Sequence, residues 1–217
     1  MVTLAWAAWW CRNKITFDNG SQCPISIATN LTKSVHDYVE YVNKVFLRGG
    51  AQRSSSANSW WECPSLGVVK VNVDAHVGSS TGLRVVIRDE NGIIRAPAVR
   101  KEAAGWAPDL AEATTCRYGL QLAARLGYFS IVLESDAKNV VQGVKMKAIG
   151  FTPFSLIIDD ICNLSSIFDV CSFSHVKHAS NTLANHVARW DSRGCNELVC
   201  LGPFPQSLLI LAEIDLL

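Results

Sequence analysis

The stretch VVKVNVDA, residues 68–75, carries the strongest fold signal in the chain. Valine at every second position alternates with Lys70, Asn72 and Asp74. An alternation of period two is typical of a β-strand with one apolar face. Asp74 stands at the end of this apolar run, where the chain is directed into a core. We therefore expect a buried strand that ends on a carboxylate.

The segments that follow predict further elements in a fixed order. LRVVIRDENGIIRAPAV, residues 83–99, places Asn91-Gly92 between two β-rich runs, which predicts a hairpin with a type I′ turn. Pro108 and Gly127 bracket a helical pattern, because proline is favoured at the start of a helix and glycine just after its end. The other expected elements are a strand at 128–134, helices at 137–147 and 153–167, a strand at 170–177 and a helix at 182–190 capped by Asn181.

This order, βββαβααβα, predicts an α/β fold. The first three strands are antiparallel neighbours, and the strand–helix–strand unit that follows implies a parallel crossover. We expect a mixed five-stranded sheet with helices packed on it.

Composition divides the chain of 217 residues into three parts. Residues 1–57 combine an aromatic-rich start, an amphipathic helical pattern and a polar linker. Residues 58–193 hold the α/β pattern. Residues 194–217, with two prolines, form a tail that either packs on the domain or frays.

Bulk properties restrict the classes of partner and compartment. The formal net charge is +1, so any basic surface for nucleic acid must be local. Eight cysteines without a CxxC pair, and no secretory-leader pattern, predict free thiols inside the cell, in nucleus or cytoplasm by default. No apolar stretch reaches the roughly 20 residues that span a bilayer, so we expect no membrane partner.

Three carboxylates follow apolar runs in this pattern. Asp74 ends the first strand, Glu112 lies in the opening turns of the first helix, and Asp136 follows the fourth strand. Like charges that are driven toward one buried place cost energy unless a cation compensates them. The sequence therefore indicates a divalent-metal site, the alternative being three unrelated surface acids.

The region from Trp61 to about Arg189 contains an ordered set of motifs: W-x-x-P-x-x-G-x-x-K-x-N-x-D ending at Asp74, V-I-R-D-E-N-G, A-E-A around Glu112, E-S-D ending at Asp136, and S-H-V…N-x-x-A. With these motifs the region resembles a type 1 ribonuclease H domain of the reverse-transcriptase-like group abundant in plant genomes. The early segment W-A-A-W-W-C-R-N-K-I-T-F is similar to the one that precedes such domains in retrotransposon-derived reading frames.

The resemblance implies endonucleolytic hydrolysis of the RNA strand of an RNA–DNA hybrid, leaving 5′-phosphate and 3′-hydroxyl ends. It also implies two Mg²⁺ ions, for which Mn²⁺ can substitute. Asp74 would bridge the two ions, and Glu112 and Asp136 would each complete one site. Nucleic acid is the implied partner, and no obligate protein partner is evident.

Two departures from the family pattern concern the same site. Asn185 stands where the family commonly carries a fourth acid, and we take it as a catalytic ligand without charge; the alternative is a helix residue with no chemical role. Arg84 stands where a second glycine is common. These departures, together with Ala75 where the family usually has glycine, support a second hypothesis, a weakened or inactive nucleic-acid-binding relic of a retrotransposon.

Four residues are candidates for contact with nucleic acid: Asn72, Arg84, Lys138 and His178. Asn72 and Arg84 are expected on the strand face that meets the nucleic-acid backbone, and Lys138 opens the helix after Asp136. His178 is the only candidate for the product-releasing histidine of the family. For Asn72, Lys138 and His178 the alternative is a solvated side chain.

Overall fold

The structure is a computed structural model that describes residues 61–148, 150–187 and 195–216. The helical segment and linker predicted for residues 1–57 lie outside the described residues. The elements are β1 (Val69–Val77), β2 (Thr81–Arg88), β3 (Ile94–Glu102), α3 (Pro108–Arg125), β4 (Ser130–Ser135), α4 (Lys138–Lys145), α5 (Pro153–Ser165), β5 (Val170–His175), η2 (His178–Ser180), α6 (Thr182–Val187), β6 (Glu197–Val199) and α7 (Gln206–Ile214).

One mixed sheet organises the described chain, with strand order β5-β4-β1-β2-β3-β6. β1, β2, β3 and β6 pair antiparallel, whereas β4 lies parallel to both β1 and β5. The predicted α/β class and the mixed pairing are confirmed. The predicted count of five strands is wrong, because β6 adds a sixth at the edge of β3. Its three residues are too few to show an alternating pattern, and their pairing depends on a partner far away in the sequence.

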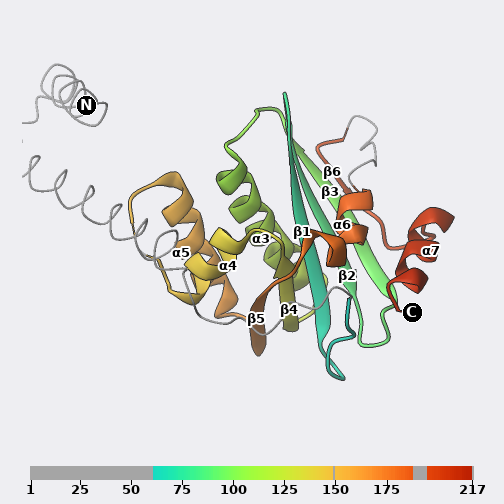
Figure 1. The fold of residues 1–217 in the computed structure, drawn as a ribbon. Coiled ribbons are helices and arrows are strands. Elements are labelled where there is room, and N and C mark those ends of the chain that lie inside the picture. Colours follow the sequence, from blue (N-terminus) through green and yellow to red (C-terminus); the bar gives the residue numbers. More distant parts are fainter. Residues whose placement is uncertain (1–60, 149, 188–194, 217) are drawn as a thin grey trace, which may run out of the picture.

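Helices cover both faces of the sheet (Figure 1). α3, α4 and α5 pack on one face, and α6 and α7 pack on the other. The run Val85-Val86-Ile87 in β2 shows why both faces are apolar: Val85 and Ile87 belong to the first core, and Val86 belongs to the second. Successive side chains of a strand point to opposite faces, so a strand buried on both sides is continuously apolar.

β1 has the alternation that the sequence predicts. Val69, Val71 and Val73 are buried in the core beneath α3, α4 and α5. Asn72 and Asp74 are also buried, on the opposite face, where the helices leave room for polar side chains. The strand thereby directs the Asp74 carboxylate away from the apolar core while holding its backbone inside the sheet.

The hairpin between β2 and β3 is present, but its turn is not of type I′. A type I′ turn needs positive φ at both central residues, and here Gly92 has φ +76° while Asn91 does not. The Asp89 carboxylate accepts hydrogen bonds from the backbone N–H groups of Asn91 and Ile93, both at 2.9 Å. These bonds stabilise a longer turn that a dipeptide signal alone does not reveal.

Asn181 precedes α6, but its side chain does not cap that helix. Its Nδ2 donates to the carbonyl of Val73 at 2.8 Å, and its Oδ1 has no hydrogen-bond partner among the described residues. The predicted cap is therefore wrong. The bond instead ties the start of α6 to the residue next to Asp74.

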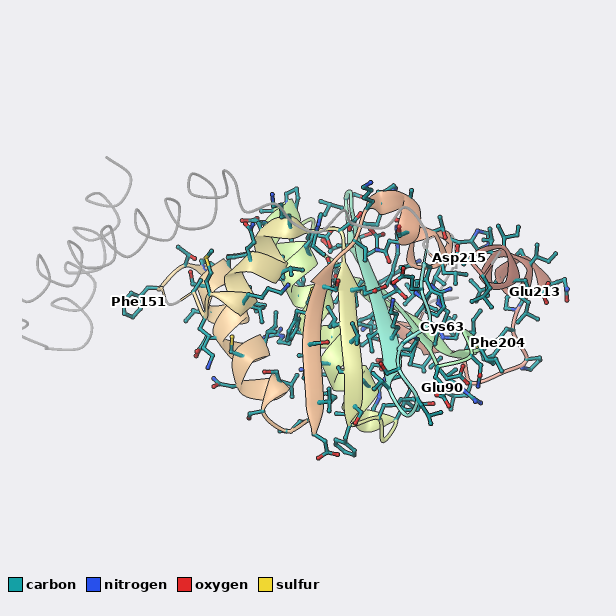
Figure 2. All side chains as sticks on the ribbon, turned by 60° about the horizontal axis from the view of Figure 1, so that its bottom comes forward. Cys63, Glu90, Phe151, Phe204, Glu213 and Asp215 are labelled. Carbon is teal, nitrogen blue, oxygen red and sulfur yellow. The ribbon has the colours of Figure 1, made fainter. Side chains whose placement is uncertain are left out.

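The C-terminal helix α7 joins the second core and is also held by charge. Leu208 and Ala212 are buried, and Asp215 accepts from Arg88 at 2.9 Å and from Thr182 at 3.0 Å. Figure 2 shows Asp215 on the side of α7 nearer the sheet and Glu213 farther out. Among the described helices, none has the length and hydropathy to cross a membrane.

Gly119 sets the distance between α3 and β1. A Cβ at this position would lie 2.8 Å from Cγ1 of Val73 and 3.2 Å from Cγ1 of Val71. Both neighbours are short, branched side chains that cannot swing away. The absence of a side chain at Gly119 therefore lets the helix that carries Glu112 approach the strand that carries Asp74.

We predict that Gly119→Ala lowers the free energy of unfolding. Overpacking costs about 1–3 kcal/mol, and the gain in helix propensity returns only about 1 kcal/mol. Urea denaturation measures the change, with Gln121→Ala on the exposed face of α3 as the control. An unchanged or increased stability of Gly119→Ala would contradict the close approach.

Candidate metal centre

Three carboxylates meet at one end of the sheet. One oxygen from each of Asp74, Glu112 and Asp136 lies within 4.8 Å of the other two. The topology explains this, because β1 and β4 are parallel neighbours and Val73 pairs with Ser135 in register. Asp74 and Asp136 therefore extend from adjacent strands at the same level. The close packing of α3 on β1 brings Glu112 to them.

Glu112 has one carboxylate oxygen that no hydrogen bond from the described part of the chain satisfies. Its Oε2 is buried and has no hydrogen-bond partner among the described residues. Burial, followed by the charges of Asp74 and Asp136, raises the pKa of Glu112 to about 8. A backbone hydrogen bond from Ala75 opposes this rise without cancelling it. In the metal-free chain Glu112 is thus largely protonated at neutral pH.

Asp74 has a cation beside it. Nη1 of Arg84 donates to Oδ2 of Asp74 at 2.7 Å, and each side chain is only 8% exposed. Burial raises the pKa of Asp74, and the guanidinium of Arg84 opposes that rise. The two residues face each other across β1 and β2 in register, so the sheet itself places them together.

Asp136 contacts His178, and His178 in turn lies beside Asn185; the sequence predicted both as site residues. Nδ1 of His178 lies 2.8 Å from Oδ2 of Asp136, and this contact is an ion pair when the imidazole is protonated. The amide Nδ2 of Asn185 lies 3.4 Å from both ring nitrogens of His178. The structure therefore brings Asn185 and His178 to the same end of the sheet as the three acids.

The donor set fits a divalent cation. Mg²⁺ and Mn²⁺ prefer oxygen ligands, and this cluster offers three carboxylates with the amide of Asn185 nearby. The unpartnered Oε2 of Glu112 supplies the independent observation, since a buried oxygen without a hydrogen bond is costly unless something binds it. Arg84 already donates to one oxygen of Asp74, so a metal ion that binds this oxygen has to compete with the guanidinium.

The four residues predicted to meet nucleic acid have different positions. Lys138 and His178 are exposed at the start of α4 and in the loop after β5. Arg84 is 7% exposed and directed at Asp74 rather than outward. Asn72 is 1% exposed, and its side chain is fully engaged inside the protein. The solvated alternative for Asn72 is therefore wrong, whereas its contact with nucleic acid stays a prediction.

Asn72 belongs to a buried polar cluster that sequence reasoning missed. Asn72 accepts from Nε1 of Trp61 at 3.1 Å and donates to Glu134 at 2.9 Å. Glu134 also binds Lys70 at 2.7 Å. The guanidinium of Arg88 lies 3.5 Å from the centroid of the Trp61 ring, a cation–π contact. The available signal was the polar face of β1, whose partners lie up to 64 residues away.

The sequence profile of a family described as reverse transcriptase-like matches residues 71–191, which is more than half of the chain. The chain belongs to this family. The matched segment includes all three converging acids and Asn185. Among curated proteins, none matches the chain.

Solved structures show the same fold. The RNase H1 of the archaeon Halobacterium salinarum NRC-1 aligns with a TM-score of 0.51 and 21% identity, over 55% of this chain and 93% of that one. The N-terminal RNase H domain of rv2228c from Mycobacterium tuberculosis aligns with a TM-score of 0.51 and 20% identity, over 57% and 91%. The described unit is therefore an RNase H-like domain.

The raised pKa of Glu112 predicts how stability depends on pH. A carboxyl whose folded pKa exceeds its unfolded value binds its proton more tightly when folded. The metal-free protein should therefore lose stability as pH rises from about 4.5 to about 8, by on the order of 5 kcal/mol for this group. Glu112→Gln has no proton to release, so it should flatten this dependence and raise the melting temperature near pH 8.

Thermal melts in a chelator across this pH range measure the effect. Asp169→Asn, which changes an exposed acid before β5, is the control and should leave the slope unchanged. A Glu112→Gln protein with the wild-type slope would show that Glu112 does not carry the pH dependence.

Proposed function

We propose that this protein is a metal-dependent endonuclease that hydrolyses the RNA strand of an RNA–DNA hybrid. The observation that carries the proposal is the convergence of three carboxylate oxygens within 4.8 Å at one end of an RNase H-like sheet. In the proposed arrangement residues 58–193 form the catalytic domain. Two bound Mg²⁺ ions would activate a water and neutralise the charge that develops on the phosphate and the leaving oxygen.

The chain's own residues have separate tasks in this proposal. Asp74, Glu112 and Asp136 hold the ions, and Glu112 must release its proton as it becomes a ligand, so binding should be favoured by rising pH. His178 orients Asp136 through its Nδ1 and stands beside Asn185. A further bond, from the Asn181 amide to the Val73 carbonyl, fixes β1 next to Asp74. These contacts limit the motion of the ligands before substrate arrives.

Recognition of the hybrid would depend on backbone and sugar contacts. Lys138 follows Asp136 by two residues, His178 contacts Asp136, and both side chains are exposed, so they can reach phosphate oxygens. A hydrogen bond to the 2′-hydroxyl distinguishes an RNA strand from a DNA strand at a given position. The net charge of +1 fits a local rather than a global basic surface.

A second candidate is a domain that binds nucleic acid without cutting it. Asn185 favours it, because an amide offers a ligand oxygen but no negative charge to hold a second ion. Arg84 also favours it, since its guanidinium already neutralises Asp74. The two candidates differ in one measurement, cleavage of a labelled hybrid by purified protein in Mg²⁺ or Mn²⁺.

We predict that Asp74→Asn lowers Mg²⁺-dependent cleavage of a hybrid duplex by roughly 100-fold or more, because it removes a charge that holds the ions at the reacting phosphate. A single-turnover assay measures the rate. Asp109→Asn, which alters an exposed acid three residues before Glu112, should cleave like the wild type. Equal rates for Asp74→Asn and wild type would remove the proposed mechanism.

We predict that Asn185→Asp raises the cleavage rate at low Mg²⁺ by roughly 10-fold, because a carboxylate adds the missing negative charge beside His178. Asn163→Asp adds the same charge on the exposed face of α5 and should have no effect. Hybrid binding without cleavage in both the wild type and Asn185→Asp would identify the non-cutting domain instead.

A further inference from the structure

Arg84 is positioned by the sheet as part of the carboxylate cluster. It lies in β2 directly opposite Asp74 in β1, and Val99 in β3 is its neighbour on the other side. Side chains that are opposite each other on neighbouring strands point to the same face. The guanidinium consequently has a fixed route to the Asp74 carboxylate, and its Nη1 lies 2.7 Å from Oδ2.

The charge of Arg84 is permanent, and water screens it poorly. Arginine stays protonated at every pH at which the protein is folded. Both members of the pair are 8% exposed, and buried charges interact more strongly than exposed ones. The charge of Arg84 is also felt at Glu112, so the guanidinium acts on two of the three acids.

The other cations on this face have different partners. Lys70 binds Glu134, and Arg88 binds Asp215, both outside the three-acid cluster. His178 contacts Asp136 but carries a charge only when protonated. Among the described residues near the cluster, Arg84 is thus the fixed positive charge that contacts one of the three acids.

We propose that Arg84 is a resident counter-ion that competes with a divalent metal ion for Asp74. The proposal deepens the function proposed above, on which it rests only in taking Asp74 as a metal ligand. A metal ion that uses both oxygens of Asp74 has to displace the guanidinium from Oδ2 or bind beside its positive charge. Either event weakens metal binding, so this chain holds its acids together without metal and needs more Mg²⁺ or Mn²⁺ to fill the site.

The first experiment measures metal affinity without any cleavage. Mn²⁺ is titrated into the full chain and free Mn²⁺ is followed by electron paramagnetic resonance. Arg84→Met keeps much of the side-chain volume and removes the charge. We expect its dissociation constant for Mn²⁺ to fall by roughly 10-fold, because a poorly screened positive charge next to the ion is removed. Arg84→Lys keeps the charge and should bind Mn²⁺ much as the wild type does.

A matched control removes an arginine that has another partner. Arg117 in α3 pairs with Asp160 in α5 at 2.6 Å, in a more exposed setting. Arg117→Met changes the net charge by the same amount and should leave Mn²⁺ affinity unchanged. Equal affinity in Arg84→Met and wild type, or weaker binding in Arg84→Met, would overturn the proposal.

A second measurement needs no variant, in case Arg84→Met does not fold without its ion pair. Mg²⁺ is titrated into the wild-type protein, and the side-chain Nε–H signals of its arginines are followed by nuclear magnetic resonance. The signal of Arg84 should shift with the same midpoint as the backbone amide of Asp74, while that of Arg88 stays in place. A stationary Arg84 signal while the Asp74 amide shifts would contradict the competition.

The outcomes separate this inference from the proposed function. Tighter Mn²⁺ binding by Arg84→Met in a protein that never cleaves a hybrid would support the counter-ion and reject the nuclease. Cleavage by the wild type together with unchanged Mn²⁺ affinity in Arg84→Met would support the nuclease and reject the counter-ion.

Discussion

The site depends on how the protein tolerates three carboxylates close together at one end of its sheet. Close carboxylates repel one another, and burial adds the cost of lost solvation. The chain meets this cost in three ways: Arg84 neutralises Asp74, Glu112 keeps its proton to about pH 8, and His178 contacts Asp136. The sequence indicated a divalent cation as the source of this compensation. The structure adds a second source, because Arg84 supplies part of the positive charge from within the sheet.

The sequence predicted the features that depend on local pattern. The valine alternation around Asn72 correctly predicted β1. Pro108 and Gly127 correctly predicted the limits of α3, which begins at Pro108 and ends at Arg125. The convergence of the acids also followed, since parallel strands place their carboxyl ends together. Each of these predictions needs only the neighbours within a strand or helix and the rules of connection.

The features that sequence reasoning missed depend on partners far apart in the chain. Asn72 and Arg84 were assigned to nucleic acid because their strand face was taken as open, but each finds a buried partner on a neighbouring strand. Asn181 has the residue type of a helix cap, yet it bonds to Val73, 108 positions away. Residue type and spacing do not specify such pairs. They are decided by strand register and by which helix covers which face.

The position of β6 matters for handling this protein. β3 would be the edge of the sheet without β6, and an open edge offers unpaired N–H and C=O groups to any neighbouring chain. α7 covers apolar side chains on the adjoining face, including Val86 and Val99. A shortened version that stops at residue 193, the end predicted for the catalytic domain, would expose both the edge and this apolar face. Such a version should aggregate during expression, and removing these last elements would hinder purification and crystallisation.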